Sequence, residues 1–221
     1  MILCVGGTPA VQRTLLFPSL EVGGVNRARE VRVTASGKAV NAARVVTTVG
    51  GPALVATFLG GDAGRFVARR LDMEGVAHHV VWTEDDAPTR TCITLLPDGG
   101  PVTELVEEAP PVSERDVAAL EKAVYGRIDV ARALCLIGSL PPGVPDHAYA
   151  QFAVAARKAG VPVLVDAQGA LLRSSLAAGP FIVKLNLQEA SAPLGLDPGD
   201  DPEAGALAAI EALLGLGPGG R

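Results

Sequence analysis

A chain of 221 residues with 48% hydrophobic and only 19% charged residues can bury one sizeable core, which excludes a disordered chain. Its formal net charge of −5 offers no electropositive surface to a polyanion, so nucleic acid is a poor candidate as a partner. No apolar run approaches the roughly 20 residues of a membrane span, and three cysteines without CxxC spacing favour reduced thiols, so we expect a cytoplasmic protein that does not enter the membrane.

The chain alternates between short apolar runs and amphipathic, helix-like stretches. Strand-like runs occur at 2–5, 53–59, 133–137, 161–165 and 181–185. These runs are apolar throughout rather than alternating, which is typical of strands buried on both faces in a parallel sheet covered by helices. The sequence therefore predicts an α/β fold with a doubly wound, mostly parallel sheet.

Helix-start signals between these runs support the same arrangement. Asp62 is predicted to cap a helix that ends near Gly75, and Ser113 with Asp116 three residues later resembles a capping box. Asp146 is predicted to open a further helix.

Two stretches, at 14–33 and 89–107, break the alternation and are predicted to form a small antiparallel accessory sheet. In the second stretch, two β-rich runs flank Pro97-Asp98-Gly99-Gly100, a turn sequence typical of a hairpin. Beside a doubly wound core such a sheet suits a lid, because a lid excludes water from a reaction. An edge extension or a dimer surface explains the pattern equally well.

The run Ser36-Gly37-Lys38-Ala39-Val40-Asn41 precedes a helical pattern that continues to Val49. A glycine, backbone N–H groups, a lysine and an amide therefore meet at a helix N-terminus, which is the composition of an anion site. The run is not a Walker A loop, since GxxxxGK[ST] does not occur in the sequence. On its own it favours the simpler interpretation of a turn at Gly37 and a solvated Lys38.

This run and five others resemble, in order, segments of the PfkB or ribokinase-like carbohydrate kinases. SGKAVNAARVVTTVGG is similar to the family's glycine-rich segment, and LGGDAGRFVARRLDMEGV to the segment after it. The other four are TPAVQRT, TRTCITLLPDGGPVTEL, GSLPPGVPDHAYAQFAVAARKAGVPVLVDAQG and FIVKLNLQEA, so the likeness runs from about residue 2 to about residue 195. TRT and GSLPPGVP are typical of the 1-phosphofructokinase, tagatose-6-phosphate kinase and minor 6-phosphofructokinase branch.

The resemblance implies a ribokinase-like doubly wound sheet with a small β lid. It also implies an ATP-dependent sugar-phosphate kinase with ATP and Mg²⁺ as cofactors. The substrate would be a sugar phosphate of the fructose or tagatose class, and the γ-phosphoryl group of ATP would pass to one of its hydroxyls.

Substrate-binding residues follow from the resemblance by position. Gly37, Lys38 and Asn41 match the family's sugar-binding loop. Arg90 in TRT matches an arginine that holds the substrate phosphate in that branch. A guanidinium is a planar fork suited to phosphate oxygens, so this role agrees with the chemistry of the side chain.

Three further positions complete the predicted substrate site. Ser139 in GSLPPG matches a loop that faces the substrate, although a serine before two prolines is equally a plain turn. Arg27 is an assisting candidate. Where the family has the aspartate of NPAxD this chain has Gln12, whose amide can hydrogen-bond sugar hydroxyls but lacks the carboxylate charge, so we expect altered affinity or sugar preference.

Lys184, Asn186 and Glu189 match the family's K-x-N-x-x-E motif, which organises Mg²⁺, water and nucleotide phosphates. Carboxylate and amide oxygens with bridging waters are what Mg²⁺ prefers. The same Asn and Glu would also form a helix cap and its reciprocal partner, and the two roles are compatible. Asp166, at the end of a strand-like run, would either line the same cleft or cap the next turn.

The family's GAGD segment, which supplies an anion hole and the catalytic base, occurs nowhere in this sequence. We therefore expect residues 1–221 to form a single incomplete ribokinase-like domain that lacks the C-terminal part and holds no catalytic residue. No metal site made by the protein alone is predicted, because His78 and His79 are adjacent on a strand-like run and would face opposite sides.

Two functions stay open. One is a sugar-phosphate kinase that is inactive as this chain alone. The other is a non-catalytic sugar-phosphate-binding or interaction protein derived from such a kinase, with a homodimer formed through the lid. A nucleoside kinase of the same fold agrees less well, because TRT implies a substrate that is already phosphorylated.

Overall fold

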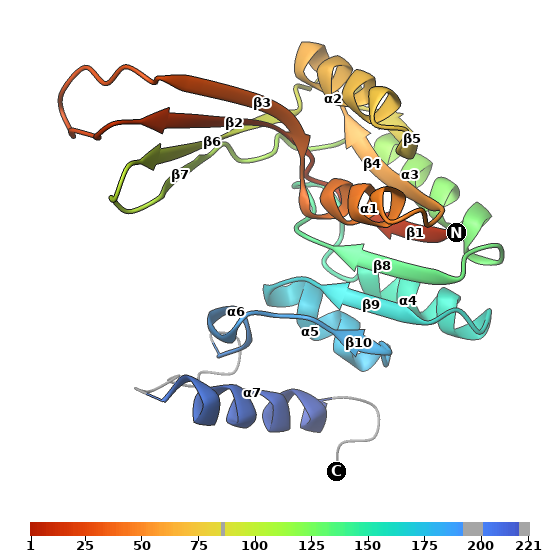
Figure 1. Ribbon diagram of the computed structural model, residues 1–221. Helices are drawn as coiled ribbons and strands as arrows, with labels where there is room; N and C mark the ends of the chain where they lie inside the picture. The colour runs from red at the N-terminus through yellow and green to blue at the C-terminus, as the bar shows by residue number, and fades with distance from the viewer. Residues whose placement is uncertain (85–86, 192–200, 217–221) are drawn as a thin grey trace.

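The computed structural model describes residues 1–84, 87–191 and 201–216, and within these ranges the strands form two sheets (Figure 1). The larger sheet has six parallel strands in the order β10-β9-β8-β1-β4-β5. Its strands are β1 (Ile2–Val5), β4 (Ala53–Leu59), β5 (Ala77–Trp82), β8 (Ala133–Ile137), β9 (Val163–Asp166) and β10 (Ile182–Val183). The predicted doubly wound, parallel α/β sheet is confirmed.

Helices pack on both faces of this sheet. On one face lie α1 (Lys38–Thr48) and α2 (Gly61–Met73), and on the other lie α3 (Glu114–Ile128), α4 (Ala148–Lys158) and α5 (Gly169–Ala177). Successive residues of a strand point into different cores: Leu3 and Val5 pack with α3 and α4, whereas Cys4 packs with α1. Each strand is therefore buried on both sides, which is why its sequence is apolar throughout.

The predicted bounds hold for β1, β4 and β8 and fail for the two strands that follow. β9 begins at Val163 rather than at residue 161, because Pro162 has no N–H to donate to the ladder and only its carbonyl accepts, from Leu134. β10 is confined to two residues at the edge of the sheet. After it come α6 (Leu187–Ser191) and α7 (Pro202–Leu216). None of the helices in the described ranges is long and apolar enough to cross a membrane.

Two of the three predicted helix starts are displaced. The prediction that Asp62 caps a helix is wrong, since Gly60 is the N-cap of α2 and Asp62 lies in the first turn. Gly60 is required there because a Cβ atom would lie 2.0 Å from the carbonyl oxygen of Ala87, which crosses directly over it. Likewise α4 is capped by His147 rather than by Asp146.

The capping box at the start of α3 is confirmed. Ser113 Oγ accepts from the Asp116 N–H at 3.1 Å, and Asp116 Oδ2 accepts from the Ser113 N–H at 3.0 Å. Asp116 is only 3% exposed and its carboxylate also accepts from the Glu84 N–H, so it joins α3 to the segment after β5.

Ser113→Ala is therefore expected to lower the free energy of unfolding by about 1 kcal/mol, since it removes one capping bond. Asp116→Ala is expected to cost more, about 2 kcal/mol, because it leaves the backbone N–H groups of both Ser113 and Glu84 without an acceptor. Urea denaturation of the two variants measures both values. Equal losses would contradict the additional role of Asp116.

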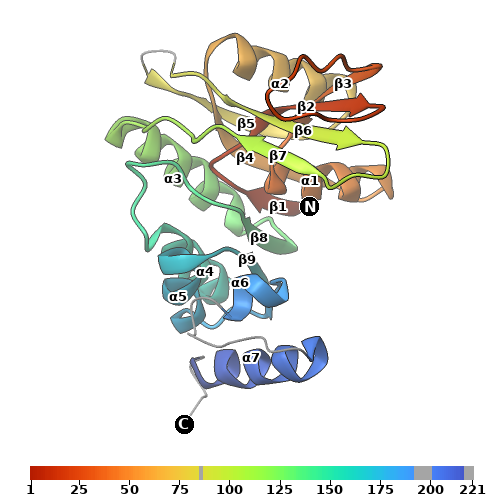
Figure 2. The ribbon, with the colours of Figure 1, turned by 90° about the vertical axis from the view of Figure 1, so that its left-hand side faces the viewer.

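The smaller sheet projects from the body of the protein (Figures 1 and 2). Its order is β3-β2-β6-β7, with strands β2 (Ala10–Phe17), β3 (Glu30–Ser36), β6 (Arg90–Pro97) and β7 (Thr103–Val106). The predicted hairpin is confirmed, since β6 and β7 pair antiparallel across residues 98–102.

The prediction that this sheet is antiparallel is wrong at its centre, where β2 and β6 pair in parallel over eight residues. The reason is topological. β2 follows the carboxyl end of β1, and β6 follows the carboxyl end of β5, so both leave the large sheet at the same edge and run outward in the same direction.

Candidate functional site

Polar side chains gather at the carboxyl edge of the large sheet, where the strand order reverses. From β1 the chain proceeds to β4 and β5 on one side, and from β8 it proceeds to β9 and β10 on the other. The loops that leave β1 and β8 therefore diverge, which opens a crevice of the kind that binds ligands in α/β sheets. A cavity of about 180 Å³ lies here, lined by Thr8, Lys38, Arg90, Gly138, Ser139, Ala167, Gln168 and Leu171.

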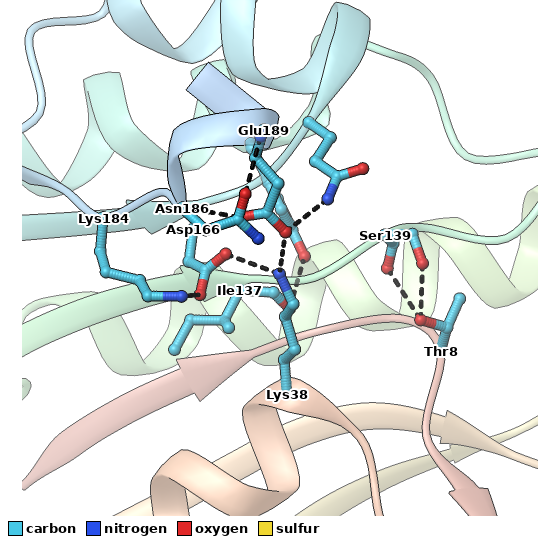
Figure 3. Close-up of polar contacts among 10 residues, drawn as sticks. Thr8, Lys38, Ile137, Ser139, Asp166, Lys184, Asn186 and Glu189 are labelled. Atoms are coloured by element: carbon cyan, nitrogen blue, oxygen red, sulfur yellow. Dashed lines mark hydrogen bonds and ion pairs between the residues drawn. The ribbon is translucent and has the colours of Figure 1, made fainter. Parts of the chain in front are cut away.

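Lys38, the first residue of α1, connects distant parts of the chain through its ammonium group (Figure 3). Its Nζ atom donates to Asp166 Oδ1 at 2.8 Å and to Glu189 Oε1 at 3.3 Å. On the other side of Asp166, Lys184 Nζ donates to Oδ2 at 3.2 Å. Burial opposes the charged ammonium, but the bonds to Asp166 and Glu189 outweigh it and raise the pKa of Lys38, so this lysine stays charged.

The Glu189 carboxylate is held by three donors. Its Oε1 atom accepts from Gln168 Nε2 at 2.5 Å as well as from Lys38, and its Oε2 atom accepts from the Asn186 N–H at 3.0 Å. Burial opposes the charge, but the bonds from Asn186, Gln168 and Lys38 prevail and lower the pKa of Glu189. Asn186 Oδ1 in turn accepts from the Glu189 N–H at 2.7 Å, so the predicted reciprocal cap is present at the start of α6.

Arg90 and Ser139, both predicted to bind substrate, lie on the cavity wall. Arg90 donates from Nη1 to the Glu107 carbonyl at 3.3 Å and from Nη2 to the Thr8 carbonyl at 3.2 Å. Within the part of the chain that the structure describes, its Nε atom is buried and has no hydrogen-bond partner. Ser139 Oγ and Thr8 Oγ1 are 2.8 Å apart and join the loops after β8 and β1.

Gly37 and Asn41 are close in sequence to Lys38, which lines the cavity, but neither of them lines it. Gly37 caps α1 with φ near 120°, and a Cβ atom there would lie 2.9 Å from Pro9 Cα, so only glycine lets the loop after β1 pass so close. Asn41 does not line the cavity. Its side chain donates to Ser36 Oγ at 3.3 Å and accepts from Arg44 Nη1 at 2.7 Å.

Gln12 and Arg27 are not brought to the cavity in this structure. The Gln12 amide donates to Thr94 Oγ1 at 2.9 Å inside the small sheet. Arg27 is exposed and belongs to the loop between β2 and β3, at the end of the small sheet that is farthest from the body (Figure 1). Their assignment to the substrate site stays a prediction that rests on the resemblance.

Asp166, given by the sequence as either a residue of the cleft or a cap, lies at the centre of the charge cluster. Two residues of the site were not among the candidates: Gln168, which donates to Glu189, and Thr8, which bonds Ser139. Their position in the chain could have indicated them, because each follows or ends a strand at the carboxyl edge.

Across the described residues, no group of three or more His, Cys, Asp or Glu side chains could hold a metal ion without other ligands.

Asp166→Asn tests the centre of this cluster, because the amide can no longer neutralise Lys38 and Lys184 together. The Asp166 side chain is 9% exposed, whereas those of Lys38 and Lys184 are 40% and 59% exposed and can regain water. We therefore expect a loss of about 1–2 kcal/mol in the free energy of unfolding. Glu30→Gln, in an exposed pair with Arg32, is the control and should change stability by less than about 0.5 kcal/mol. Equal losses in both would mean that Asp166 has no special role.

An open parallel sheet with a crevice at its strand-order reversal, flanked by a projecting second sheet, defines the ribokinase-like class of α/β fold. Solved structures agree. Phosphofructokinase-2 from Escherichia coli in complex with substrates and products is 25% identical, with a TM-score of 0.84 over 98% of this chain and 69% of its own. The tetrameric inhibited form of that enzyme is 26% identical, with a TM-score of 0.80 over 96% and 70%. A possible 1-phosphofructokinase from Thermotoga maritima shares the fold at 23% identity, with a TM-score of 0.84 over 95% and 68%.

The pfkB family of carbohydrate kinases matches residues 1–218, and the chain therefore belongs to this family. It spans 68–70% of the length of the three solved relatives.

Proposed function

We propose that this chain carries the substrate side and part of the nucleotide side of an ATP-dependent sugar-phosphate kinase of the phosphofructokinase or tagatose-6-phosphate kinase type. The observation that carries the proposal is the cavity at the strand-order reversal, with Lys38 and Arg90 both on its wall. Two cationic side chains on one small cavity suit a ligand that bears a phosphate. The hydroxyls of Thr8 and Ser139 and the amide of Gln168 lie on the same wall and suit sugar hydroxyls.

The nucleotide side of the proposed site is formed by Lys184, Asn186 and Glu189. Mg²⁺ is usually held by one or two carboxylates, with water and substrate phosphates completing its shell. Asp166 and Glu189 fit this demand, because they already share one cation, the Lys38 ammonium. When bound, Mg²⁺ would neutralise charge on the transferred phosphoryl group. Lys184 lies beside the same carboxylates and would hold a phosphate oxygen.

Lys38 gives the two sides of this proposed site a physical connection. It lines the cavity and also bonds Asp166 and Glu189, so one ammonium group can reach a phosphate of either ligand. Phosphoryl transfer depends mainly on positioning and on charge stabilisation. We therefore assign Lys38 to aligning the sugar phosphate with the nucleotide.

A second candidate function is non-catalytic binding of sugar phosphates. It requires neither an anion hole nor a catalytic base. This function needs the same cavity and the same cations, so binding alone does not separate the two candidates. Turnover does.

Calorimetric titration tests the shared requirement. Fructose 6-phosphate, fructose 1-phosphate and tagatose 6-phosphate are compared with fructose and tagatose, which differ only in lacking the phosphate. We expect at least one phosphorylated sugar to bind about tenfold or more tightly than its parent sugar, which corresponds to one charge-assisted hydrogen bond. Equal affinities for each phosphorylated sugar and its parent would overturn the proposal.

We also propose that the small sheet forms a homodimer. Leu105 and Val106 on β7 are each 51% exposed and point to opposite faces, and Val31 on β3 is 46% exposed. A sheet with apolar side chains open on both faces is typical of an interaction surface. Sedimentation velocity should find a dimer that Leu105→Asp dissociates, while Val130→Asp, outside this sheet and at a site 68% exposed, leaves it intact. A monomeric wild type would contradict this prediction.

A further inference from the structure

Cys4 and Cys135 lie opposite each other on neighbouring strands of the large sheet. Cys4 of β1 pairs in register with Cys135 of β8, and both are free thiols. Directly paired residues point to the same face of a sheet, and neighbouring strands lie about 4.8 Å apart. That spacing falls within the Cα separation of about 4.4–6.8 Å that a disulfide bridges. The two thiols are close enough for each to shift the pKa of the other.

The two thiols differ in access to solvent. Cys4 is fully buried beneath α1, whereas Cys135 is only partly buried. On the same face, the cover thins towards the edge of the sheet, where Leu164 of β9 is partly buried and Ile182 of β10 is 46% exposed. A small reagent can therefore reach Cys135 first.

The thiols also differ in acidity, and Cys135, the more accessible of the two, is the more acidic. The interaction with Cys4 lowers the pKa of Cys135, although burial acts against it. The same interaction, together with burial, raises the pKa of Cys4. The more accessible thiol is thus the one that forms a thiolate more readily, and thiolates are the reactive form.

We propose that Cys4 and Cys135 form a dithiol site that a hydroperoxide oxidises reversibly to an intramolecular disulfide. The Cys135 sulfur attacks one peroxide oxygen, so that an S–O bond forms and the O–O bond breaks. Cys135 becomes a sulfenic acid and the peroxide is reduced to water or an alcohol. The Cys4 sulfur then attacks the sulfenic sulfur, the S–S bond forms, the S–O bond breaks, and water leaves with the Cys4 proton. Two thiols and one hydroperoxide thus give one disulfide, one water and one alcohol or second water.

The site lies next to the cavity. β1 ends one residue after Cys4 and leads to Thr8, and β8 ends two residues after Cys135 and leads to Ser139. A disulfide here would therefore join the two strands just below the loops whose hydroxyls are in contact.

The test uses the Cys92→Ser variant. Cys92 lies on β6 of the small sheet, and replacing it leaves Cys4 and Cys135 as the two cysteines of the chain. After treatment with hydrogen peroxide, thiols are counted in denaturant and the intact mass is measured. We expect both thiols to be lost, the mass to fall by two hydrogens, the chain to stay unlinked to others on a non-reducing gel, and dithiothreitol to restore both thiols.

Two further variants in the same background serve as controls. With Cys135→Ser, the buried Cys4 should keep its thiol, and with Cys4→Ser, Cys135 should gain oxygen atoms instead of forming an intramolecular disulfide. Oxidation of Cys135 to sulfinic or sulfonic acid while Cys4 stays free in the Cys92→Ser protein would overturn the proposal, as would a disulfide that forms only between chains. If Cys92→Ser does not fold, peptide mapping of the oxidised wild type gives the same decision, because the expected product is a Cys4–Cys135 disulfide with Cys92 outside it.

Discussion

Residues 1–221, purified and supplied with Mg²⁺ and ATP, are expected to phosphorylate no hexose or hexose phosphate at a rate typical of kinases, about 1–100 per second. The reason is the absence from this sequence of a GAGD segment. General-base assistance is worth about 10²–10⁴-fold, and each donor to a developing negative charge about 10²–10³-fold. The joint loss should bring turnover close to background even where both ligands bind.

A coupled assay of ADP release on homogeneous protein measures this, with a longer pfkB kinase as the positive control. Glu189→Ala separates activity of this chain from that of a contaminating kinase, because Glu189 lies at the centre of the nucleotide side of the proposed site. Turnover above about 1 per second that Glu189→Ala abolishes would show that residues 1–221 build a complete active site. In that case only the prediction of inactivity would be wrong, and the proposal that the chain binds a sugar phosphate would stand.

Arg90→Ala is expected to weaken binding of the preferred phosphosugar by about 10–100-fold, the equivalent of about 1.5–3 kcal/mol for one charge-assisted hydrogen bond. Arg90 lies on the cavity wall. Arg90→Lys should recover part of the affinity, because it restores the charge but not the planar fork. Lys38→Ala should also weaken binding, since Lys38 is the other cation on the wall.

Arg32→Ala is the matched control, since it removes an arginine from the same small sheet whose guanidinium is exposed and paired with Glu30. Arg90 also bonds the carbonyls of Thr8 and Glu107, so thermal unfolding of each variant should accompany the titrations. A folded Arg90→Ala protein with wild-type affinity would remove Arg90 from the phosphate site.

Features that depend on neighbouring residues were predicted well from the sequence. The apolar runs of β1, β4 and β8 have the predicted bounds, because burial on both faces demands apolar residues at every position. The capping box at Ser113 and the reciprocal cap of Asn186 and Glu189 are also confirmed, because both partners lie three residues apart. In each of these cases the interaction is formed within one segment.

Features that depend on how the chain crosses itself were predicted poorly. Asp62 has the chemistry of a cap, but the crossing of Ala87 over Gly60 decides where α2 begins. The Gln12 amide donates to Thr94 on the neighbouring strand, a contact that local sequence does not indicate, and its role in sugar binding stays a prediction. β2 and β6 pair in parallel because both leave the large sheet at the same edge, although they lie about 80 residues apart in the sequence. The turn sequence of the hairpin does not predict this pairing.

By itself the sequence determined the fold class and, through six ordered motifs, the family, because alternating apolar runs and local turn chemistry are properties of short segments. Only the tertiary structure decided which charges meet. Lys38 is 128 residues from Asp166 and 151 from Glu189. The three meet because β3 of the small sheet returns the chain, at the start of α1, to the edge of the large sheet where β9 and β10 end. Sequence assigned Lys38 and Glu189 to separate sides of the site, whereas the strand order placed a single buried carboxylate, Asp166, between two lysines and so made those sides one charge cluster.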